Sequence, residues 1–419
     1  MNVCIIGSGG REHALCYKIK QSKKLKQLFC MPGNPGTAQI CQNLTVDISD
    51  FDKIYSSLLK NKIDLVIVGP EIPLVNGLVD FLDKKKIRTF GPSKKAAQLE
   101  GSKIFMKNLC KQFNIPSAKY FEINSIEEAI EVLKTMNEPV VVKSDGLAAG
   151  KGVTICKTKD QAIKDISSIL NGKFSSSRKV IIEEFLEGEE ASYFVITDGK
   201  NFKQIGTAQD HKRIGENDTG PNTGGMGAYS PSLIINKSLE EKIINKIIIP
   251  TIKGMKELGC PYKGILYAGL MIKDNEPKLI EYNIRFGDPE CQVLMMRLED
   301  DLLELIISSI EENLDNKKIH WSKDPCITIV AASKGYPENF EKLTEIKNLP
   351  SNKEKNIQMF HAGTTTKNGK ILSNGGRVLN STVMLPTLKS SREKALQLLD
   401  ELDWKNKYYR RDIGWRAIK

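Results

Sequence analysis

The sequence lacks long hydrophobic runs. None of its segments reaches the roughly 18 consecutive apolar residues that a membrane span needs, so we expect no transmembrane helix and no membrane partner. The N-terminal segment MNVCIIGSGGREHA also lacks the basic region and the long apolar region of a secretory signal peptide. Together these absences predict a cytoplasmic protein.

Cysteine is present without a pattern. The nine cysteines are odd in number and no two form a C-x-x-C pair, which argues against a disulfide framework and against a zinc site. We expect scattered, buried or partly buried thiols. A G-x-S-x-G motif and a Cys/His pair are also missing, which disfavours chemistry through an acyl-enzyme.

Acidic residues are outnumbered by basic ones. The 419 residues include 62 Lys and Arg against 51 Asp and Glu, a net charge of +11. This excess is compatible with nucleic-acid binding, but the lysines are spread along the chain, and the longest run, Lys84-Lys85-Lys86, fits a solvated helix end. Nucleotides and sugar phosphates would suit such a surface equally well. We therefore expect no nucleic-acid partner, and salt-dependent binding to a duplex would test that alternative.

Length and apolar patterning predict a folded protein of two to four domains, because domains of about 100–200 residues are usual. Apolar segments at residues 3–6, 64–68 and 88–90 each run into a glycine-containing turn, which predicts a parallel α/β sheet with ligands at the carboxyl ends of its strands. Further strands are expected in the rest of the chain, at residues 139–143, 180–184, 264–272, 278–283 and 326–332. A helix is expected at 302–310, and β-hairpins at Asn368-Gly369 and Asn374-Gly375-Gly376.

Two glycine-rich loops resemble nucleotide-binding motifs without matching them. Gly7-Ser8-Gly9-Gly10 lacks the third glycine of a dinucleotide fingerprint, but backbone N–H groups at a helix start, together with Arg11, would bind a phosphate. The alternative is a tight structural turn. Residues 143–152 do not fit a Walker A loop, and we interpret them as a flap over a triphosphate, with an ordinary glycine-rich hairpin as the alternative.

Carboxylates downstream suit a nucleotide and a metal. The strand ending at Glu183 and Glu184 can read an adenine edge through its backbone, and a following carboxylate can accept from ribose hydroxyls. Glu281 and Asn283 occupy alternate strand positions, which places two oxygen ligands for Mg²⁺ on one face. Arg285 would then reach a charged oxygen. The polar segment at residues 209–227 is long enough to imply a role, and its His211 is either a base or a hydrogen-bonded structural residue.

Ten motifs occur along the chain in a fixed order, and together they are specific enough to indicate a family. The segments GSGGREHA, PGNPG, GPEIPL, GPSKKAAQLEGSK, VVVKSDGLAAGKGV, EEFLEGEEAS, QDHKR, GPNTGGMGAYSP, YAGLMI and EYNIRFGDPE, in this order, resemble the glycinamide ribonucleotide synthetase family, or phosphoribosylamine–glycine ligases, of the ATP-grasp superfamily. The resemblance extends from residue 1 into the C-terminal region and is to the monofunctional bacterial form.

The resemblance implies a ligase of de novo purine synthesis. ATP, glycine and 5-phosphoribosylamine would give glycinamide ribonucleotide, ADP and phosphate through glycyl phosphate, with Mg²⁺ or Mn²⁺. The implied architecture mixes α/β and α+β domains: a parallel α/β domain at residues 1–101, an ATP-grasp domain at 102–325 with a flap subdomain at about 120–187, and a small C-terminal mixed β domain at 326–419. A monomer is expected, and a transient hand-over from the enzyme that makes phosphoribosylamine remains open.

The resemblance also implies roles for single residues. ATP would be bound by Lys103, Lys143, Gly146, Gly150, Lys151, Gly152, Glu183, Glu184, Phe185, Leu186 and Glu189. The metal would be bound by Glu281 and Asn283. Glycine and phosphoribosylamine would be bound by Gly9, Gly10, Arg11, Glu12, Asn34, Asp210, Lys212, Asn222, Thr223, Gly224, Gly225 and Arg285. The residues expected to act in catalysis are Arg285, Lys143 and Asp210.

Two other classes of protein, one an enzyme class and one a binding class, fit the sequence less well. Another ATP-grasp ligase or carboxylase, such as a formate-using relative, fits less well because of GSGGREHA and GPNTGGMGAYSP. A Rossmann-type dinucleotide-binding or regulatory module would need a third glycine after Gly9 and an acidic residue about twenty positions on, and neither is clear.

Overall fold

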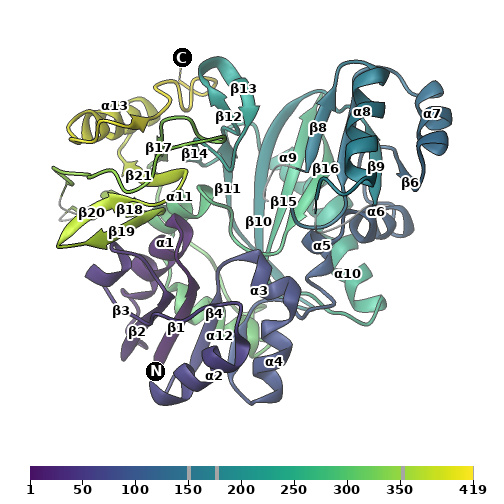
Figure 1. Ribbon diagram of the computed structural model, residues 1–419. Coiled ribbons are helices and arrows are strands. Elements are labelled where there is room, and N and C mark those ends of the chain that lie inside the picture. Colours follow the sequence, from purple (N-terminus) through teal and green to yellow (C-terminus); the bar gives the residue numbers. More distant parts are fainter. Residues whose placement is uncertain (149–151, 175–178, 351–353, 419) are drawn as a thin grey trace.

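A computed structural model describes residues 1–148, 152–174, 179–350 and 354–418 (Figure 1). Within these ranges, no helix combines the length and the apolar character that crossing a bilayer requires. The predicted flap residues Gly150 and Lys151 lie outside the described residues.

The N-terminal part of the chain is a parallel sheet in the order β3-β2-β1-β4-β5. Its strands are β1 (Asn2–Gly7), β2 (Gln27–Pro32), β3 (Gln42–Asn43), β4 (Leu65–Val68) and β5 (Arg88–Phe90). The accompanying helices are α1 (Gly10–Ile19), η1 (Thr37–Gln39), α2 (Phe51–Lys60), α3 (Glu71–Asn76), α4 (Leu78–Lys84) and α5 (Gln98–Gly101). The predicted parallel sheet is confirmed. Its strand order reverses at β1, so the turns after β1 and β4 lie side by side at the position where such sheets bind ligands.

A second, smaller body follows α6 (Lys103–Gln112). It consists of β6 (Tyr120–Ile123), α7 (Ile126–Lys134), β7 (Val140–Ser144), β8 (Val153–Cys156), α8 (Lys159–Leu170) and β9 (Val180–Glu184). The four strands pair antiparallel in the order β6-β9-β7-β8. They share with α7 and α8 a core of their own, and in Figure 1 this body projects at one end of the molecule.

A nine-stranded antiparallel sheet forms the rest of the framework. Its strands are β10 (Glu189–Asp198), β11 (Phe202–Asp210), β14 (Gly227–Ser230), β15 (Lys263–Lys273), β16 (Glu276–Asn283), β17 (Cys326–Ser333), β18 (Ile357–His361), β21 (Arg377–Met384) and β22 (Lys407–Tyr408). The order is β16-β15-β10-β11-β14-β17-β21-β18, and β22 pairs with β17. Where β14 meets β17, a Cβ on Gly227 would lie 2.6 Å from the carbonyl oxygen of Thr328, so glycine permits the approach.

The remaining elements flank these sheets. They are β12 (Arg213–Gly215), η2 (Glu216–Asp218), β13 (Thr219–Asn222), α9 (Lys237–Ile243), η3 (Ile244–Ile248), α10 (Ile249–Glu257), α12 (Leu302–Ile310), β19 (Thr364–Lys367), β20 (Lys370–Ser373) and α13 (Leu388–Asp400). The helix at 302–310 and the hairpin at Asn368-Gly369 are confirmed. A hairpin at Asn374-Gly375-Gly376 is wrong, because β21 pairs with β17 and β18 instead of returning along β20.

Helix α11 (Glu290–Arg297) lies at the centre, with all of its residues buried. It contacts α1 on one side and β11, β14, β17 and β21 on the other (Figure 1). The N-terminal sheet and both halves of the large sheet therefore meet around one helix.

Candidate functional site

Three lysines gather around one buried glutamate of β9. Lys143 Nζ lies 2.9 Å from Glu183 Oε2, and Lys107 Nζ lies 3.3 Å from Glu183 Oε1. Lys103, one helical turn before Lys107 on α6, donates to the carbonyl of Gly146 at 2.9 Å. Burial lowers the pKa of Lys103. Glu281 and Asp145 also act on Lys103, so the lysines belong to a charged cluster whose ammonium groups can bind the oxygens of a polyphosphate.

The described ends of the predicted flap are Gly146 and Gly152. Gly146 has a φ of +83°, where glycine is favoured, and its carbonyl receives the Lys103 bond. The carbonyl of Gly152 accepts from the N–H of Ser144 at 2.8 Å. Both ends are thus anchored beside the lysines.

The residues after Glu183 form the connection from β9 to β10. Since the Glu183 carboxylate is paired with lysines, an adenine edge would meet the backbone of this segment and not that side chain. Phe185 is exposed, Glu184 and Leu186 are half-buried, and Glu189 opens β10 with its side chain in solvent.

The predicted metal ligands lie at the end of β16. Glu281 is half-buried and Asn283 is buried, on the same face of the strand. Burial opposes ionisation of Glu281, but Lys212, Lys143 and Lys103 together lower its pKa, and Lys212 Nζ lies 3.8 Å away. The carboxylate is therefore anionic and interacts electrostatically with these lysines. Two oxygen ligands next to a polyphosphate fit Mg²⁺, which protein sites usually hold by one or two carboxylates together with phosphates.

Asp210 lies against the glycine-rich loop at residues 222–225. Burial and the nearby Glu290 raise the pKa of Asp210. Gly225 has a φ of +111°, and a Cβ there would lie 2.7 Å from Asp210 Oδ1. The hydroxyl of Thr223 donates to the carbonyl of Lys212 at 2.8 Å and accepts from the N–H of Gly225 at 3.0 Å. The loop thus lies next to polar side chains, and its hydrogen bonds hold its own backbone in place.

Arg377 on β21 anchors the same loop from the C-terminal part of the chain. Its Nη1 donates to the carbonyl of Gly224 at 2.6 Å and to that of Asp288, and lies 3.7 Å from the Asp288 carboxylate. The hydroxyl of Tyr336 accepts from the N–H of Gly224 at 3.0 Å. Asn222, at the end of β13, pairs with Arg213. Sequence reasoning missed Arg377 and Asp288, although Asp288 stands in the motif EYNIRFGDPE.

Glu12 shapes the first glycine-rich turn from inside. Its two carboxylate oxygens accept from the N–H of Gly9 and from Arg11 Nε, each at 2.6 Å. A Cβ on Gly7 or Gly69 would lie 2.5 Å or 2.2 Å from this side chain, so both turns need glycine. Contact between Glu12 and a substrate stays a prediction, but its carboxylate already has two partners.

Two amides face Gly10 at the start of α1. A Cβ there would lie 2.5 Å from Gln292 Nε2 of α11 and 2.5 Å from Asn380 Nδ2 of β21. The Oε1 atom of Gln292 is buried and has no hydrogen-bond partner in the described part of the chain. Amide groups from two other parts of the fold therefore adjoin the predicted phosphate turn.

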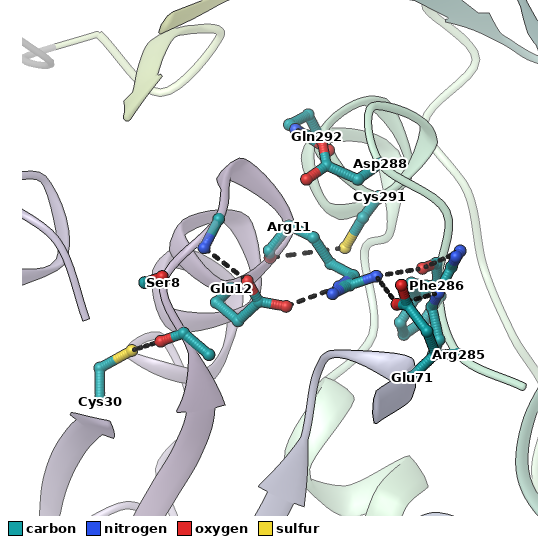
Figure 2. A network of polar contacts seen from close by, with 12 residues as sticks. Ser8, Arg11, Glu12, Cys30, Glu71, Arg285, Phe286, Asp288, Cys291 and Gln292 are labelled. Carbon is teal, nitrogen blue, oxygen red and sulfur yellow. Dashed lines mark hydrogen bonds and ion pairs between the residues drawn. The ribbon is translucent and has the colours of Figure 1, made fainter. Parts of the chain in front are cut away.

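Arg11 and Arg285 share a network with two glutamates that sequence reasoning missed, Glu71 and Glu100, of which Figure 2 shows Glu71. Arg285 Nε lies 3.2 Å from Glu71 Oε2, and its Nη2 lies 3.0 Å from Glu100 Oε1. Arg11 Nη1 donates to the carbonyl of Phe286 at 3.3 Å and lies 4.0 Å from Glu71. Burial opposes ionisation of Glu71, but Arg285 and Arg11 lower its pKa to about 2. Burial raises the pKa of Glu100 to about 7.

Two further predicted residues have structural partners. The Asn34 amide donates to the carbonyls of Ser8 and His361, at 2.8 and 2.9 Å, and its Oδ1 accepts from the N–H groups of Gly36 and Thr37. It thereby ties the loop at residues 33–37 to the turn after β1. His211 Nε2 accepts from the N–H of Gly414 at 3.0 Å, and burial lowers the pKa of His211 to about 4. The structural alternative for this histidine is the better description.

Comparisons with known proteins agree along the whole chain. Family models described as Phosphoribosylglycinamide synthetase match residues 1–100 (N domain), 101–291 (ATP-grasp domain) and 326–416 (C domain). A phosphoribosylamine–glycine ligase of Mesorhizobium japonicum is 48% identical over 100% of this chain and 99% of its own length. The chloroplastic enzyme of that name from Arabidopsis thaliana is 48% identical over 98% of this chain and 79% of its own length.

Solved structures give the same result. The crystal structure of a phosphoribosylamine–glycine ligase from Thermotoga maritima is 34% identical and matches with a TM-score of 0.85, over 99% of this chain and 100% of that one. The biotin carboxylase domain of a 2-oxoglutarate carboxylase from Hydrogenobacter thermophilus matches with a TM-score of 0.76 at 16% identity, over 97% and 91% of the two chains. That likeness is one of fold.

Proposed function

The chain belongs to the phosphoribosylglycinamide synthetase family, and on this premise we propose that it joins glycine to 5-phosphoribosylamine at the expense of ATP. The products are glycinamide ribonucleotide, ADP and phosphate, in de novo purine synthesis. The glycine carboxylate attacks the γ-phosphoryl group to give glycyl phosphate, and the sugar amine then displaces phosphate.

One observation carries the proposal beyond family membership: the lysine group and the ligand pair of β16 are electrostatically coupled. Lys143 Nζ lies 3.5 Å from the carbonyl oxygen of Ile280, the residue before Glu281, and Lys103 and Lys143 both favour the ionised form of Glu281. Phosphoryl transfer requires mainly positioned positive charge around the transferring group. A site built from lysines and a metal-binding carboxylate suits that chemistry.

We assign the nucleotide to the lysine side. Lys103 and Lys143 neutralise its phosphates, Gly146 and Gly152 bound the covering loop, and the 184–186 backbone with Glu189 holds the nucleoside. Glu281 and Asn283 would hold the divalent ion, for which we propose Mg²⁺ or Mn²⁺. Bound there, the ion supplies charge neutralisation at the phosphates. Arg285 holds the glycine carboxylate or the transferred group, once the pairing with Glu71 and Glu100 is relaxed.

We assign the two acceptor substrates to the opposite side. Asp210 and Lys212, with the 222–225 loop, orient glycine, and a carboxylate next to an amino group fits that substrate. Gly9 and Gly10 present backbone N–H groups to the phosphate of phosphoribosylamine, and Arg11 lies beside them. The support is the convergence of α1, α11 and β21 at this point.

Several features stay predictions. We propose the division into residues 1–101, 102–325 with a flap at about 120–187, and 326–419. A monomeric state, a cytoplasmic location, a hand-over of phosphoribosylamine, and the lack of a nucleic-acid or membrane partner are proposed from the sequence alone.

The decisive experiment is glycine-dependent ADP release, with phosphoribosylamine generated in situ from ribose 5-phosphate and ammonia. We expect ADP only when glycine, the sugar phosphate and a divalent cation are all present. Formate in place of glycine tests the other ATP-grasp chemistry. Glu281→Gln serves as the inactive comparison and Lys278→Gln, a solvent-exposed neighbour on β16, as the matched control. ADP release at the same rate with and without glycine would refute the proposal.

A further inference from the structure

Three thiols lie together beneath the first glycine-rich turn. Cys16 is on α1, Cys30 on β2, and Cys41 follows η1. The sulfur atoms of Cys16 and Cys41 are 4.0 Å apart. All nine cysteines of the chain are free, and Cys41 is the one among them that is not fully buried. A partly buried cysteine therefore lies next to a fully buried one.

The three thiols have different partners. Cys30 donates to the carbonyl of Gly7 at 3.4 Å, as Figure 2 shows, and so is held toward β1. Burial raises the pKa of Cys16, whereas side-chain hydrogen bonding with Cys16 and Cys30 lowers the pKa of Cys41. Cys41 is thus the thiol that loses its proton more readily, and Cys16 is its neutral neighbour. Thiolate character and exposure together determine which cysteine an oxidant reaches.

We propose that Cys41 and Cys16 are a peroxide-sensitive pair that closes to a disulfide. The Cys41 thiolate attacks a peroxide oxygen, the O–O bond breaks, and Cys41 becomes a sulfenic acid while the peroxide leaves as water or an alcohol. The Cys16 sulfur then attacks the Cys41 sulfur, an S–S bond forms, the S–O bond of the sulfenic acid breaks, and its hydroxyl group leaves as water with the Cys16 proton. Two thiols are oxidised by two electrons and one peroxide is reduced; a dithiol reductant reverses the change.

Closure would disturb the neighbouring substrate turn. The Cys41 thiol donates to the carbonyl of Thr37 at 3.2 Å, and the N–H of Thr37 donates to Asn34 Oδ1 at 3.0 Å. Asn34 in turn donates to the carbonyl of Ser8. A disulfide removes the thiol hydrogen and brings the two sulfur atoms to about 2.05 Å. The hydrogen bond from Cys41 to Thr37 is then lost, and with it the series of hydrogen bonds that connects Cys41 to the turn at Ser8.

The chemical test is independent of activity. The full-length protein is treated with hydrogen peroxide, its remaining thiols are alkylated, and its tryptic peptides are analysed by mass spectrometry. Peptides 12–18 and 27–53 carry Cys16 and Cys41. We expect them to be linked after peroxide and separate after dithiothreitol. Because peptide 27–53 also contains Cys30, the experiment is repeated with Cys30→Ser, in which the link should persist.

Variants separate the pair from general oxidation. Cys41→Ser and Cys16→Ser should each abolish the link, while Cys110→Ser, which alters a buried thiol on α6, should leave it intact. A missing link in the wild-type protein, a link through Cys30, or oxidation of Cys41 to sulfinic acid without a link would overturn the proposal. Circular dichroism of each variant shows that the fold is retained.

A kinetic arm tests the coupling to the turn, and it rests on the proposed function. Peroxide should raise the apparent KM for phosphoribosylamine several-fold and leave that for ATP unchanged, with recovery on reduction. Cys41→Ser, which keeps a hydroxyl donor to Thr37, should respond to peroxide in neither constant. If the disulfide forms and the KM does not move, the coupling is refuted while the thiol pair stands. If no substrate dependence is found at all, the proposed function fails and the chemical test is unaffected.

Discussion

Glu100 should make the protein less stable as the pH rises toward neutrality. Its carboxylate is buried between the N–H of Ile284 and the guanidinium of Arg285, at 2.9 and 3.0 Å. Burial raises its pKa to about 7, against an ordinary value of 4.5, with Arg285 opposing and Glu71 reinforcing the change. Between these two pH values the folded protein therefore holds a proton that the unfolded chain has released.

The sign and size follow from proton linkage. Because the folded state binds more protons, the free energy of unfolding falls as pH rises from about 4.5 to about 7. Each pKa unit corresponds to about 1.4 kcal/mol. Between pH 5 and pH 8 the loss amounts to about 2–3 kcal/mol. Glu100→Gln removes this titration, so the variant should gain about that much relative to the wild-type protein across the interval.

Urea unfolding of both proteins at several pH values measures the difference. The amide introduced by Glu100→Gln fits the two donors less well than a carboxylate does, but this cost is the same at every pH. It therefore does not affect how the stability difference between variant and wild type changes with pH. Glu71→Gln is the matched control: the pKa of Glu71 is lowered to about 2, so its stabilisation is complete above about pH 5 and is lost only in acid. Because Glu71 also helps to raise the pKa of Glu100, the stability difference of Glu71→Gln from the wild-type protein should change between pH 5 and pH 8 by much less than that of Glu100→Gln. A flat difference for Glu100→Gln would refute the reasoning.

Three further substitutions test the site. Glu281→Gln should lower turnover by roughly a hundredfold with the fold intact, because the proposed carboxylate ligand of the divalent ion is lost; metal-dependent turnover and circular dichroism check this. Arg11→Ala should raise the apparent KM for phosphoribosylamine roughly tenfold and leave that for ATP unchanged, because the proposed charged contact with the phosphate is lost. Arg377→Met should raise the KM for glycine roughly tenfold or more, since the carbonyl of Gly224 loses its charged donor. The free energy of unfolding should change by less than the free energy that corresponds to this rise in KM.

Each has an outcome that contradicts it. Unchanged metal dependence in Glu281→Gln would remove that residue from the metal site. A raised ATP requirement in Arg11→Ala, with phosphoribosylamine unaffected, would put the phosphate site in the wrong part of the fold. A normal glycine KM in Arg377→Met would mean that the glycine-rich loop keeps its shape without this contact.

The framework of the fold was predictable because its signals are local. Buried strands such as β4 are continuously apolar, and the turns after them contain glycine for geometric reasons that hold at Gly7 and Gly69. The Glu281 and Asn283 pair was also readable, because alternate strand residues share a face. Family resemblance supplied the identity of the site, which spacing alone left open.

The unpredicted parts are contacts between distant segments. Arg377 reaches the carbonyl of Gly224 across 153 residues, and Arg285 meets Glu71 across 214, so no spacing rule could connect them. The pairing of β14 with β17 is another such case, since a strand pattern specifies which face is buried and not which strand lies beside it. Lys107 was the exception: its four-residue spacing from Lys103 was available as a signal.

The shared sheet also limits how the molecule can be divided. A chain cut at residue 325 would end with β14 as an open edge, its row of backbone donors and acceptors facing solvent where β17 had covered them. Such a fragment is an aggregation hazard and not a smaller enzyme. Among the described residues, the four-stranded body shares no ladder of paired strands with the large sheet, although an isolated bridge joins Ser117, just before β6, to Leu279 of β16. We therefore expect substrate binding to move this body more easily than it moves the two halves of the large sheet relative to each other.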